Sequence, residues 1–346
     1  MGPRYGPQTP GGAFCPLGGT LGSVKALVTG ATGFIGSHLV EYLIQRGDEV
    51  TCLARSRSRL RWLEGLQVRV IEGDCTDPDL GGRVHEDFDW IFHLAGLTKT
   101  LDRHEFYRVN GEGTANLAAI LAKKRQPPRL VYLSSLAAAG PSKDGHPLRE
   151  SDPPQPVSHY GRSKLEGEKA LAGLGGALPW VIVRAPVIYG PRDRGLLVFF
   201  QLAKRRVAFR LGERRAVSLC EVQDLIRGLH LAADRGEAGE IYYVAEASPR
   251  SWDEISEAIA AALGVRPMTI PFPPPFLSAL AWTWEGIARF TGIQPLLNRD
   301  KACEMQQPYW VCDPGKAARD LGFATSISLG TGTERAVEWY KSYGWL

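Results

Sequence analysis

From residue 24 to about residue 190, short apolar segments alternate with segments of helical periodicity, and this alternation allows only a few folds. The apolar segments are rich in β-branched residues and mostly uninterrupted, as expected for strands covered on both faces of a sheet. The predicted strands are residues 24–29, 49–54, 67–72, 90–94, 129–134 and 180–184. The predicted helices between them are residues 34–46, 106–123 and 160–173. This order predicts an α/β fold with a doubly wound, parallel sheet.

Three glycines with the spacing GxxGxxG, at positions 30, 33 and 36, follow the first predicted strand and open the first predicted helix. We expect a tight turn at Gly30, close approach of a pyrophosphate at Gly33 and close packing of helix on strand at Gly36. Loops also use glycine without any ligand. The position between a strand and a helix nevertheless favours a dinucleotide site in a Rossmann-type fold. The other predicted cofactor contacts in this segment are Thr32, Phe34 and Ile35.

The residues that follow the second predicted strand bear on which dinucleotide binds. A carboxylate there would bind a ribose 2′-hydroxyl, whereas an arginine would pair with a 2′-phosphate. The chain has Arg55 and Arg57, with no acidic residue before Glu64, so NADP is favoured over NAD unless these arginines belong to a solvated loop. After the third predicted strand, Asp74 next to Cys75 is placed to bind an adenine amino group or to cap a turn.

Tyr160 and Lys164 stand four residues apart in a predicted helix, so both side chains lie on one face. A tyrosine with a pKa of about 10 is a poor base at neutral pH, but a neighbouring ammonium and an oxidised nicotinamide would lower that pKa. Ser135 ends the fifth predicted strand, at the edge of the sheet where ligands bind, and its hydroxyl could polarise a substrate carbonyl. The alternatives are an exposed helix face for the pair and a strand-end cap for Ser135.

Together these motifs resemble the extended short-chain dehydrogenase/reductase family, which includes nucleotide-sugar epimerases, dehydratases and enzymes similar to 3β-hydroxysteroid dehydrogenase. The resemblance runs from about residue 24 to the C-terminus and also includes His93-Leu94-Ala95-Gly96, Asn110 and the segment 184–191. It implies Ser135, Tyr160 and Lys164 as a catalytic triad. It implies cofactor contacts at Leu94, Ala95, Gly96, Tyr160, Lys164 and Pro186.

The same resemblance bears on substrate and assembly. Candidate substrate contacts are Thr98, Ser135, Tyr189 and Arg192. Many members of the family form a homodimer through the helices that here carry Asn110 and Tyr160, and a homodimer is a possible assembly for this chain.

Two departures from the family pattern bear on which of the family's reactions and substrates this chain can use. Leu136 and Ala137 follow Ser135 where nucleotide-sugar 4,6-dehydratases have an acidic pair, so dehydration is disfavoured. Val217 stands where nucleotide-sugar enzymes have an arginine for the diphosphate, although Arg214 and Arg215 lie close enough in the sequence to substitute.

After residue 190 the pattern becomes irregular, which predicts a smaller, mainly substrate-binding part at 191–346 after a dinucleotide-binding domain at 24–190, with sheet elements returning later. Residues 269–293 are rich in proline and aromatic residues. They would suit an apolar substrate such as a steroid, an isoprenoid or a lipid, or they are simply core. A third possibility is a membrane-surface patch formed by Trp282, Trp284 and Phe290.

Composition excludes several classes of protein. The 346 residues carry 41 Lys and Arg against 37 Asp and Glu, and a net charge of +4 is too small to indicate nucleic-acid binding. No apolar run reaches the roughly 18 residues of a membrane span, and no secretory signal is expected. Six scattered cysteines without metal-ligand spacing predict reduced thiols, no metal site and a cytoplasmic protein. Residues 1–23, with seven glycines and four prolines, are expected to form a flexible tail.

The sequence therefore predicts an NAD(P)-dependent oxidoreductase that interconverts a secondary alcohol and a ketone on an apolar small molecule. The alternative is a nucleotide-sugar epimerase that keeps NAD tightly bound. A binding protein that senses the cofactor without catalysis is a third class, which the complete Ser-Tyr-Lys set disfavours.

Overall fold

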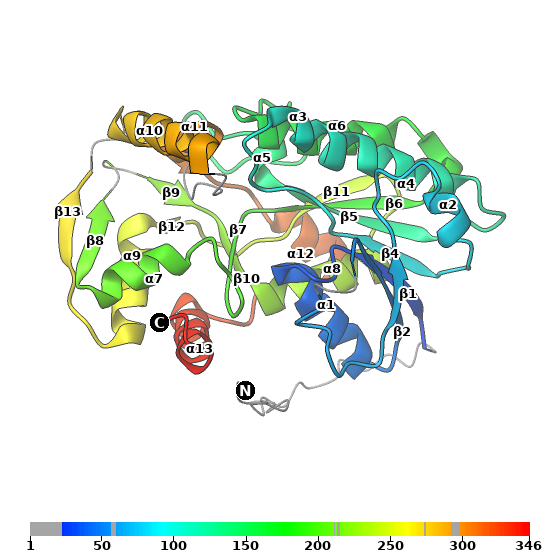
Figure 1. Ribbon diagram of the computed structural model, residues 1–346, viewed down its shortest axis with the longest axis horizontal. Helices are drawn as coiled ribbons and strands as arrows, with labels where there is room; N and C mark the ends of the chain where they lie inside the picture. Colours follow the sequence, from blue (N-terminus) through cyan, green and yellow to red (C-terminus); the bar gives the residue numbers. More distant parts are fainter. Residues whose placement is uncertain (1–22, 57–59, 211, 213–214, 273–274, 292–297) are drawn as a thin grey trace.

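A seven-stranded sheet, in which every neighbouring pair is parallel, forms the centre of the computed structural model (Figure 1). The structure describes residues 23–346 except 57–59, 211, 213–214, 273–274 and 292–297. The strand order is β11-β6-β5-β4-β1-β2-β3. The strands are β1 (Lys25–Thr29), β2 (Glu49–Ala54), β3 (Arg69–Glu72), β4 (Trp90–His93), β5 (Arg129–Ser135), β6 (Trp180–Ala185) and β11 (Glu240–Tyr243). The predicted fold class is confirmed, and the six predicted strands are correct to within two residues at each end.

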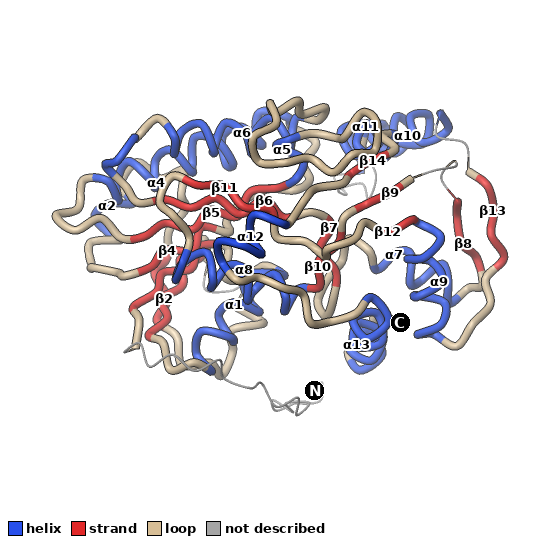
Figure 2. The backbone as a smooth tube through the Cα atoms, turned by 180° about the vertical axis from the view of Figure 1, so that it is seen from behind, coloured by secondary structure: helices blue, strands red, loops and turns tan. Residues whose placement is uncertain are grey.

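Helices cover both faces of this sheet (Figures 1 and 2). Ala26 and Val28 of β1 pack into one core cluster with residues of α1 and α8, whereas Leu27 packs into a second cluster with residues of α4 and α6. This alternation is the two-residue period of a strand buried on both faces. The helices are α1 (Phe34–Gln45), α8 (Val222–Arg235) and α12 (Gly315–Leu321) on the first face, and α2 (Leu80–Arg83), α4 (Gly113–Ala122) and α6 (His159–Ala172) on the second.

The predicted helix at 106–123 is helical throughout residues 103–122, but not all of it is α-helix. It consists of α3 (Arg103–Phe106), a π-helical turn η2 (Tyr107–Glu112) and α4. Single π-turns inside helices occur mostly at functional sites, since the extra residue redirects a side chain. Here the turn contains Asn110, which is fully buried.

Most of the part after residue 190 forms small sheets and helices beside the main sheet (Figure 2). Three of its elements belong to the main sheet instead: β11 is one of the seven strands, and α8 and α12 pack on one face of the sheet. The other helices of this part are α7 (Leu197–Lys204), α9 (Trp252–Leu263), α10 (Pro275–Thr291), α11 (Arg299–Gln306) and α13 (Leu329–Ser342). Its strands are β8 (Val207–Arg210), β9 (Ala216–Val217), β10 (Leu219–Glu221), β12 (Arg250–Ser251), β13 (Met268–Pro271) and β14 (Tyr309–Trp310). The strand β7 (Val187–Tyr189) comes just before residue 190 and pairs with β10. Two short helices complete the chain, namely α5 (Leu136–Ala139) and η3 (Gly175–Ala177).

Several expectations depend on segments that are only partly described. The predicted tail at 1–23 lies outside the described residues except for residue 23, and Cys15 lies outside them too. The other five cysteines are free thiols. Within the described ranges, no helix has the length and apolarity needed to cross a membrane, and no group of three His, Cys, Asp or Glu side chains could hold a metal ion.

Candidate active site

The glycine turn between β1 and α1 is fixed by the packing of the backbone. Gly30 has a φ of +71°, and a Cβ there would lie 2.6 Å from the carbonyl carbon of Leu94. A Cβ on Gly36 would lie 2.2 Å from the carbonyl oxygen of Gly30. Both positions therefore require glycine for the fold itself.

Gly33 differs, because a Cβ there would meet only the Gly30 carbonyl, at 3.2 Å, and the residue is exposed. Gly33 is the N-cap of α1, and no side chain caps this helix end. The first N–H groups of a helix carry a partial positive charge and need acceptors. This uncapped helix end with open space beside it fits the pyrophosphate of a dinucleotide.

Replacing Gly33 with Ala should separate the binding role from the folding role. We expect dinucleotide affinity to fall about tenfold or more, since the methyl group occupies the approach to the helix end. Thermal stability should change little. Gly36→Ala, in contrast, should lower the melting temperature because its Cβ collides with the backbone. Fluorescence titration with dinucleotide and thermal melts measure both effects. Unchanged affinity in Gly33→Ala would mean that this glycine serves the turn alone.

A buried chain of hydrogen bonds holds the loop after β4. The Thr114 hydroxyl donates to the Asn110 carbonyl (2.7 Å), so its oxygen accepts from Nε2–H of His93 (2.9 Å). Nδ1 of His93 is then left to accept the Thr29 hydroxyl hydrogen (2.7 Å), and the Thr29 oxygen accepts the N–H of Ala95 (3.1 Å). Burial, and secondarily the charge of Lys164, lowers the pKa of His93 to about 3, consistent with a neutral ring. His93 thus positions the Ala95 backbone.

Asn110 connects this loop to α6. Its Oδ1 accepts the N–H of Leu97 (2.8 Å), and its Nδ2 donates to the Leu97 carbonyl and to Oγ of Ser163 (both 2.9 Å). A Cβ on Gly96 would lie 3.0 Å from Oδ1 of Asn110 and 3.6 Å from Nζ of Lys164. The Leu94–Gly96 backbone, the glycine turn and the Lys164 ammonium are therefore held side by side, as a bound dinucleotide requires.

Tyr160, Lys164 and Ser135 lie together at the carboxyl end of β5. Tyr160 lies close enough to Ser135 for that side chain to lower the pKa of the tyrosine. Lys164 is only 4% exposed, and its Nζ lies 4.3 Å from the centre of the Tyr132 ring. Ser135 also caps α5, since its Oγ accepts the N–H of Ala137 (3.1 Å). The structure thus places Tyr160 next to Ser135, and Lys164 one turn further along the same helix, beside Gly96.

Burial sets the protonation of this group. It raises the pKa of Tyr160 to about 12, partly offset by the hydrogen bond with Ser135 and reinforced by the charge of Glu304. Burial lowers the pKa of Lys164 to about 7, against the opposing effect of Glu168. At neutral pH the tyrosine therefore keeps its proton, whereas the lysine is close to half-protonated.

Two acidic residues of α11, which the sequence analysis missed, hold the N-terminus of α6. The Asp300 carboxylate accepts the N–H groups of His159 (2.6 Å) and Tyr160 (3.1 Å). Glu304 accepts the hydroxyl hydrogen of Ser158 (2.7 Å), which itself caps the helix. Anionic groups stabilise a helix N-terminus, so α11 holds the first turn of α6, which carries Tyr160, in position.

The other predicted cofactor residues have mixed placements. Asp74 closes a turn, since its Oδ1 accepts from the N–H (2.9 Å) and the hydroxyl (3.0 Å) of Thr76. Cys75 beside it is buried. Arg55 is exposed just after β2, and Arg57 lies outside the described residues. The half-buried positions are Thr32, Phe34, Ile35, Leu94, Ala95 and Pro186.

Of the predicted substrate residues, Ser135 lies in the site and Thr98 is exposed beyond Gly96. Tyr189 is only 2% exposed and packs against Gly332. Arg192 turns toward α1, where it donates to Oγ of Ser37 (3.0 Å) and pairs with Glu41 (2.5 Å). Tyr189 is therefore packed in the core and Arg192 is held by α1, and a substrate contact of either residue stays a prediction.

The proposed replacement for a diphosphate-binding arginine also fails for Arg215. Its guanidinium donates to the backbone carbonyls of Met305 and Gln306 at the end of α11. Val217 is buried in the core, and Arg214 lies outside the described residues.

The fold and this site define a dinucleotide-dependent enzyme of the short-chain dehydrogenase/reductase type. The chain belongs to the NAD dependent epimerase/dehydratase family, whose model matches residues 26–245. This confirms the family that the motifs resemble.

Individual relatives within the family differ in substrate. The chain is 31% identical to the ceramide reductase of Caulobacter vibrioides, over 92% of this chain and 95% of that protein. It is 27% identical to the 4-hydroxy-2-methyl-3-oxo-4-farnesyl-3,4-dihydroquinoline-1-oxide ketoreductase of Stigmatella aurantiaca, over 90% and 95%. Among solved structures, it is similar to MoeE5 in complex with UDP-glucose and NAD, with a TM-score of 0.72, 25% identity and coverage of 92% and 99%.

Proposed function

We propose that this enzyme reduces a ketone on a long, apolar substrate to a secondary alcohol, and catalyses the reverse oxidation, with Ser135, Tyr160 and Lys164 as the reacting groups. The observation that carries the proposal is the position of Tyr160 beside Ser135, close enough for Ser135 to affect the pKa of the tyrosine, with Lys164 buried beside Gly96. These groups lie at the carboxyl end of a parallel sheet, where doubly wound folds bind their ligands. Residues 24–190 with β11 would bind the cofactor, and most of 191–346 would bind the substrate.

A nicotinamide dinucleotide, held by the glycine turn and the Leu94–Gly96 backbone, would supply the hydride. Tyr160 would donate its hydroxyl proton to the carbonyl oxygen that the hydride makes basic, and Ser135 would hold that oxygen by a hydrogen bond. The charged form of Lys164 would stabilise the tyrosinate that remains. Because the pKa of Tyr160 is about 12, the tyrosine carries the proton that reduction needs at neutral pH.

The substrate class is supported by two independent lines. Val217 stands where nucleotide-sugar enzymes have an arginine, and the guanidinium of Arg215 is already bonded to backbone carbonyls of α11, which disfavours a sugar nucleotide; Arg214 lies outside the described residues. Two relatives that cover nearly the whole chain are a ceramide reductase and a ketoreductase of a farnesyl compound, both with long apolar groups. A substrate with a long hydrocarbon chain and a ketone therefore fits best.

The purified protein should consume NADPH with a long-chain ketone and should prefer NADPH to NADH in binding titrations. Arg55→Ser should lower the ratio of NADPH affinity to NADH affinity, because it removes the cation that follows β2 and would pair with the 2′-phosphate. Mass spectrometry of the denatured protein identifies any dinucleotide that it retains. Retained NAD, with no net turnover on ketones, would instead establish the alternative of a nucleotide-sugar epimerase.

A further inference from the structure

The large hydrophobic side chains that are exposed in this protein are concentrated in one segment. Six of the eight in the described part of the chain lie between Met268 and Ile287, on β13 and α10. The most exposed are Trp282 (68%), Met268 (66%) and Phe276 (61%). Scattered surface hydrophobics are normal, but a concentration of this kind marks an interaction surface.

Helix α10 has a narrow buried edge and a wide apolar exposed surface. Leu277 and Ala281 pack with Ala302 of α11. Phe276, Leu280 and Trp284 follow one another at intervals of four residues on the adjoining side and are exposed. The remaining exposed positions between residues 276 and 288 are uncharged, namely Ser278, Ala279, Trp282, Thr283, Gly286 and Ile287. Glu285 is half-buried and paired with Arg299 (2.7 Å).

The ribbon of β8 and β13, at the same end of the molecule, supplies positive charge (Figures 1 and 2). Phe272, at the end of β13, contacts Phe209 of β8 and Phe276 of α10, which connects the ribbon to the helix. The exposed cations of the ribbon and its flanks are Lys204, Arg205, Arg206, Arg210 and Arg266. Arg210 pairs with Asp253 (3.1 Å), whereas the other four form no ion pair with any described residue.

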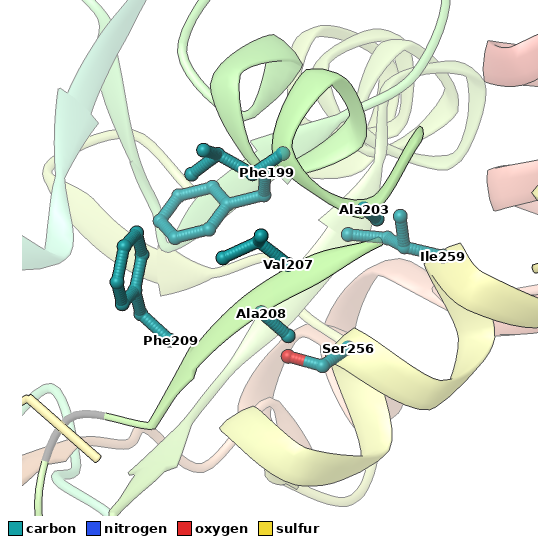
Figure 3. A pocket seen from close by; sticks show the side chains of 8 residues that line it. Phe199, Ala203, Val207, Ala208, Phe209, Ser256 and Ile259 are labelled. Atoms are coloured by element: carbon teal, nitrogen blue, oxygen red, sulfur yellow. The ribbon is translucent and has the colours of Figure 1, made fainter. Parts of the chain in front are cut away.

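The inner side of this ribbon is closed by its own packing. Phe199 of α7, Phe209 of β8 and Ile259 of α9 line a cavity of only about 10 Å³ (Figure 3). A space of this size holds at most one water molecule, so it is no substrate site. The ribbon is thus a packed support whose outward cations are available to a partner.

We infer that α10 and the β8–β13 ribbon dock on the surface of a lipid bilayer with anionic headgroups. An apolar aromatic helix face offers burial of apolar area, and the ribbon that Phe272 joins to it carries exposed cations, most of them where β8 and β13 begin. These are the two attractions that hold a protein on such an interface, burial of apolar area and attraction to anionic lipid. Tryptophan side chains are suited to the headgroup level. The docking face consists of these five cations with Met268, Phe276, Leu280, Trp282 and Trp284.

The position of this docking face suits an enzyme for lipid-like ketones. Helix α10 packs on α11, and α11 holds the N-terminus of α6 through Asp300 and Glu304. A substrate dissolved in the bilayer would therefore lie near the site that contains Tyr160. The docking itself requires no turnover, so it stands apart from the proposed reaction.

Co-sedimentation tests the docking. The full chain should sediment with vesicles of phosphatidylcholine and phosphatidylglycerol, and less with phosphatidylcholine alone. Phe276→Ser with Trp284→Ser should weaken binding at least about tenfold, and Arg206→Glu with Arg266→Glu should remove the preference for phosphatidylglycerol. Thermal melts check that each variant is folded.

Two matched control variants carry comparable substitutions outside the docking face. Tyr343 is 48% exposed, as is Trp284, but lies on the segment after α13, so Tyr343→Ser should bind as the wild type does. Lys123→Glu with Arg125→Glu makes the same charge change beyond α4. No sedimentation of the wild type with anionic vesicles, or equal losses in these controls, would overturn the docking face. A dimer that the serine variants dissociate, without vesicle binding, would assign the face to a second copy of the chain.

Discussion

Replacing Tyr160 with Phe is expected to lower the rate of ketone reduction about 10²- to 10⁴-fold, the range for loss of a general acid. The substitution removes only the hydroxyl, which lies beside Ser135 and donates the proton in the proposed reaction. The ring stays in its half-buried place, so dinucleotide affinity should stay nearly unchanged. Single-turnover reduction and a binding titration separate these two effects.

Tyr107 provides the matched control for this substitution. It is also half-buried, and its hydroxyl hydrogen-bonds with Nδ1 of His159, one residue before Tyr160 (2.8 Å). Tyr107→Phe therefore removes a similar hydroxyl close to the site without touching the reacting group. Activity in Tyr160→Phe equal to that of Tyr107→Phe would exclude Tyr160 as the proton donor.

The sequence predicted the sheet well because its strands are buried on both faces. Strands such as β1 and β5 must be apolar at almost every position, so they stand out from the helical segments around them. The strand β11 has four residues within an irregular region, and its individual position could not be assigned. It pairs with β6, more than 50 residues earlier in the chain, which only the tertiary fold brings about.

The site was predictable where its chemistry is local in the chain. The glycine turn and the Tyr160–Lys164 pair each lie within a few residues, so spacing alone indicates their geometry. Asp300 and Glu304 could not be found in this way, since they lie about 140 residues beyond the helix end they hold.

Side-chain direction limited the prediction of substrate contacts. Tyr189 and Arg192 stand next to the Pro186 loop in sequence, which suggested a common role. The structure turns Tyr189 into the core, and Arg192 has a φ of +71° that directs it toward Glu41 of α1. Residues close in sequence thus lie in different environments. The packing that separates them cannot be predicted from the sequence.

Removing Arg184 should cause the largest loss of stability of any single change considered. Arg184 and Glu168 form a bidentate ion pair (2.7 and 3.0 Å), and the side chains are only 2% and 4% exposed. Ser134 also donates to Glu168 (2.5 Å). Arg184→Met leaves the carboxylate buried without its cation, and loss of one partner of a buried pair costs about 3–5 kcal/mol. Denaturant unfolding of the variant measures this cost.

The loss in free energy of unfolding should be large because the Arg184–Glu168 pair is buried, and small for an exposed ion pair. Arg184→Met with Glu168→Met removes both charges, and its free energy of unfolding should recover much of the loss, since neither member of the ion pair stays buried without the other. Arg210→Met breaks the pair with Asp253, in which both side chains are about half exposed, and should cost less than about 1 kcal/mol. Equal losses in Arg184→Met and Arg210→Met would show that the buried network adds no special stability. A double variant less stable than Arg184→Met would show instead that the pair is favourable beyond the cost of its isolated members.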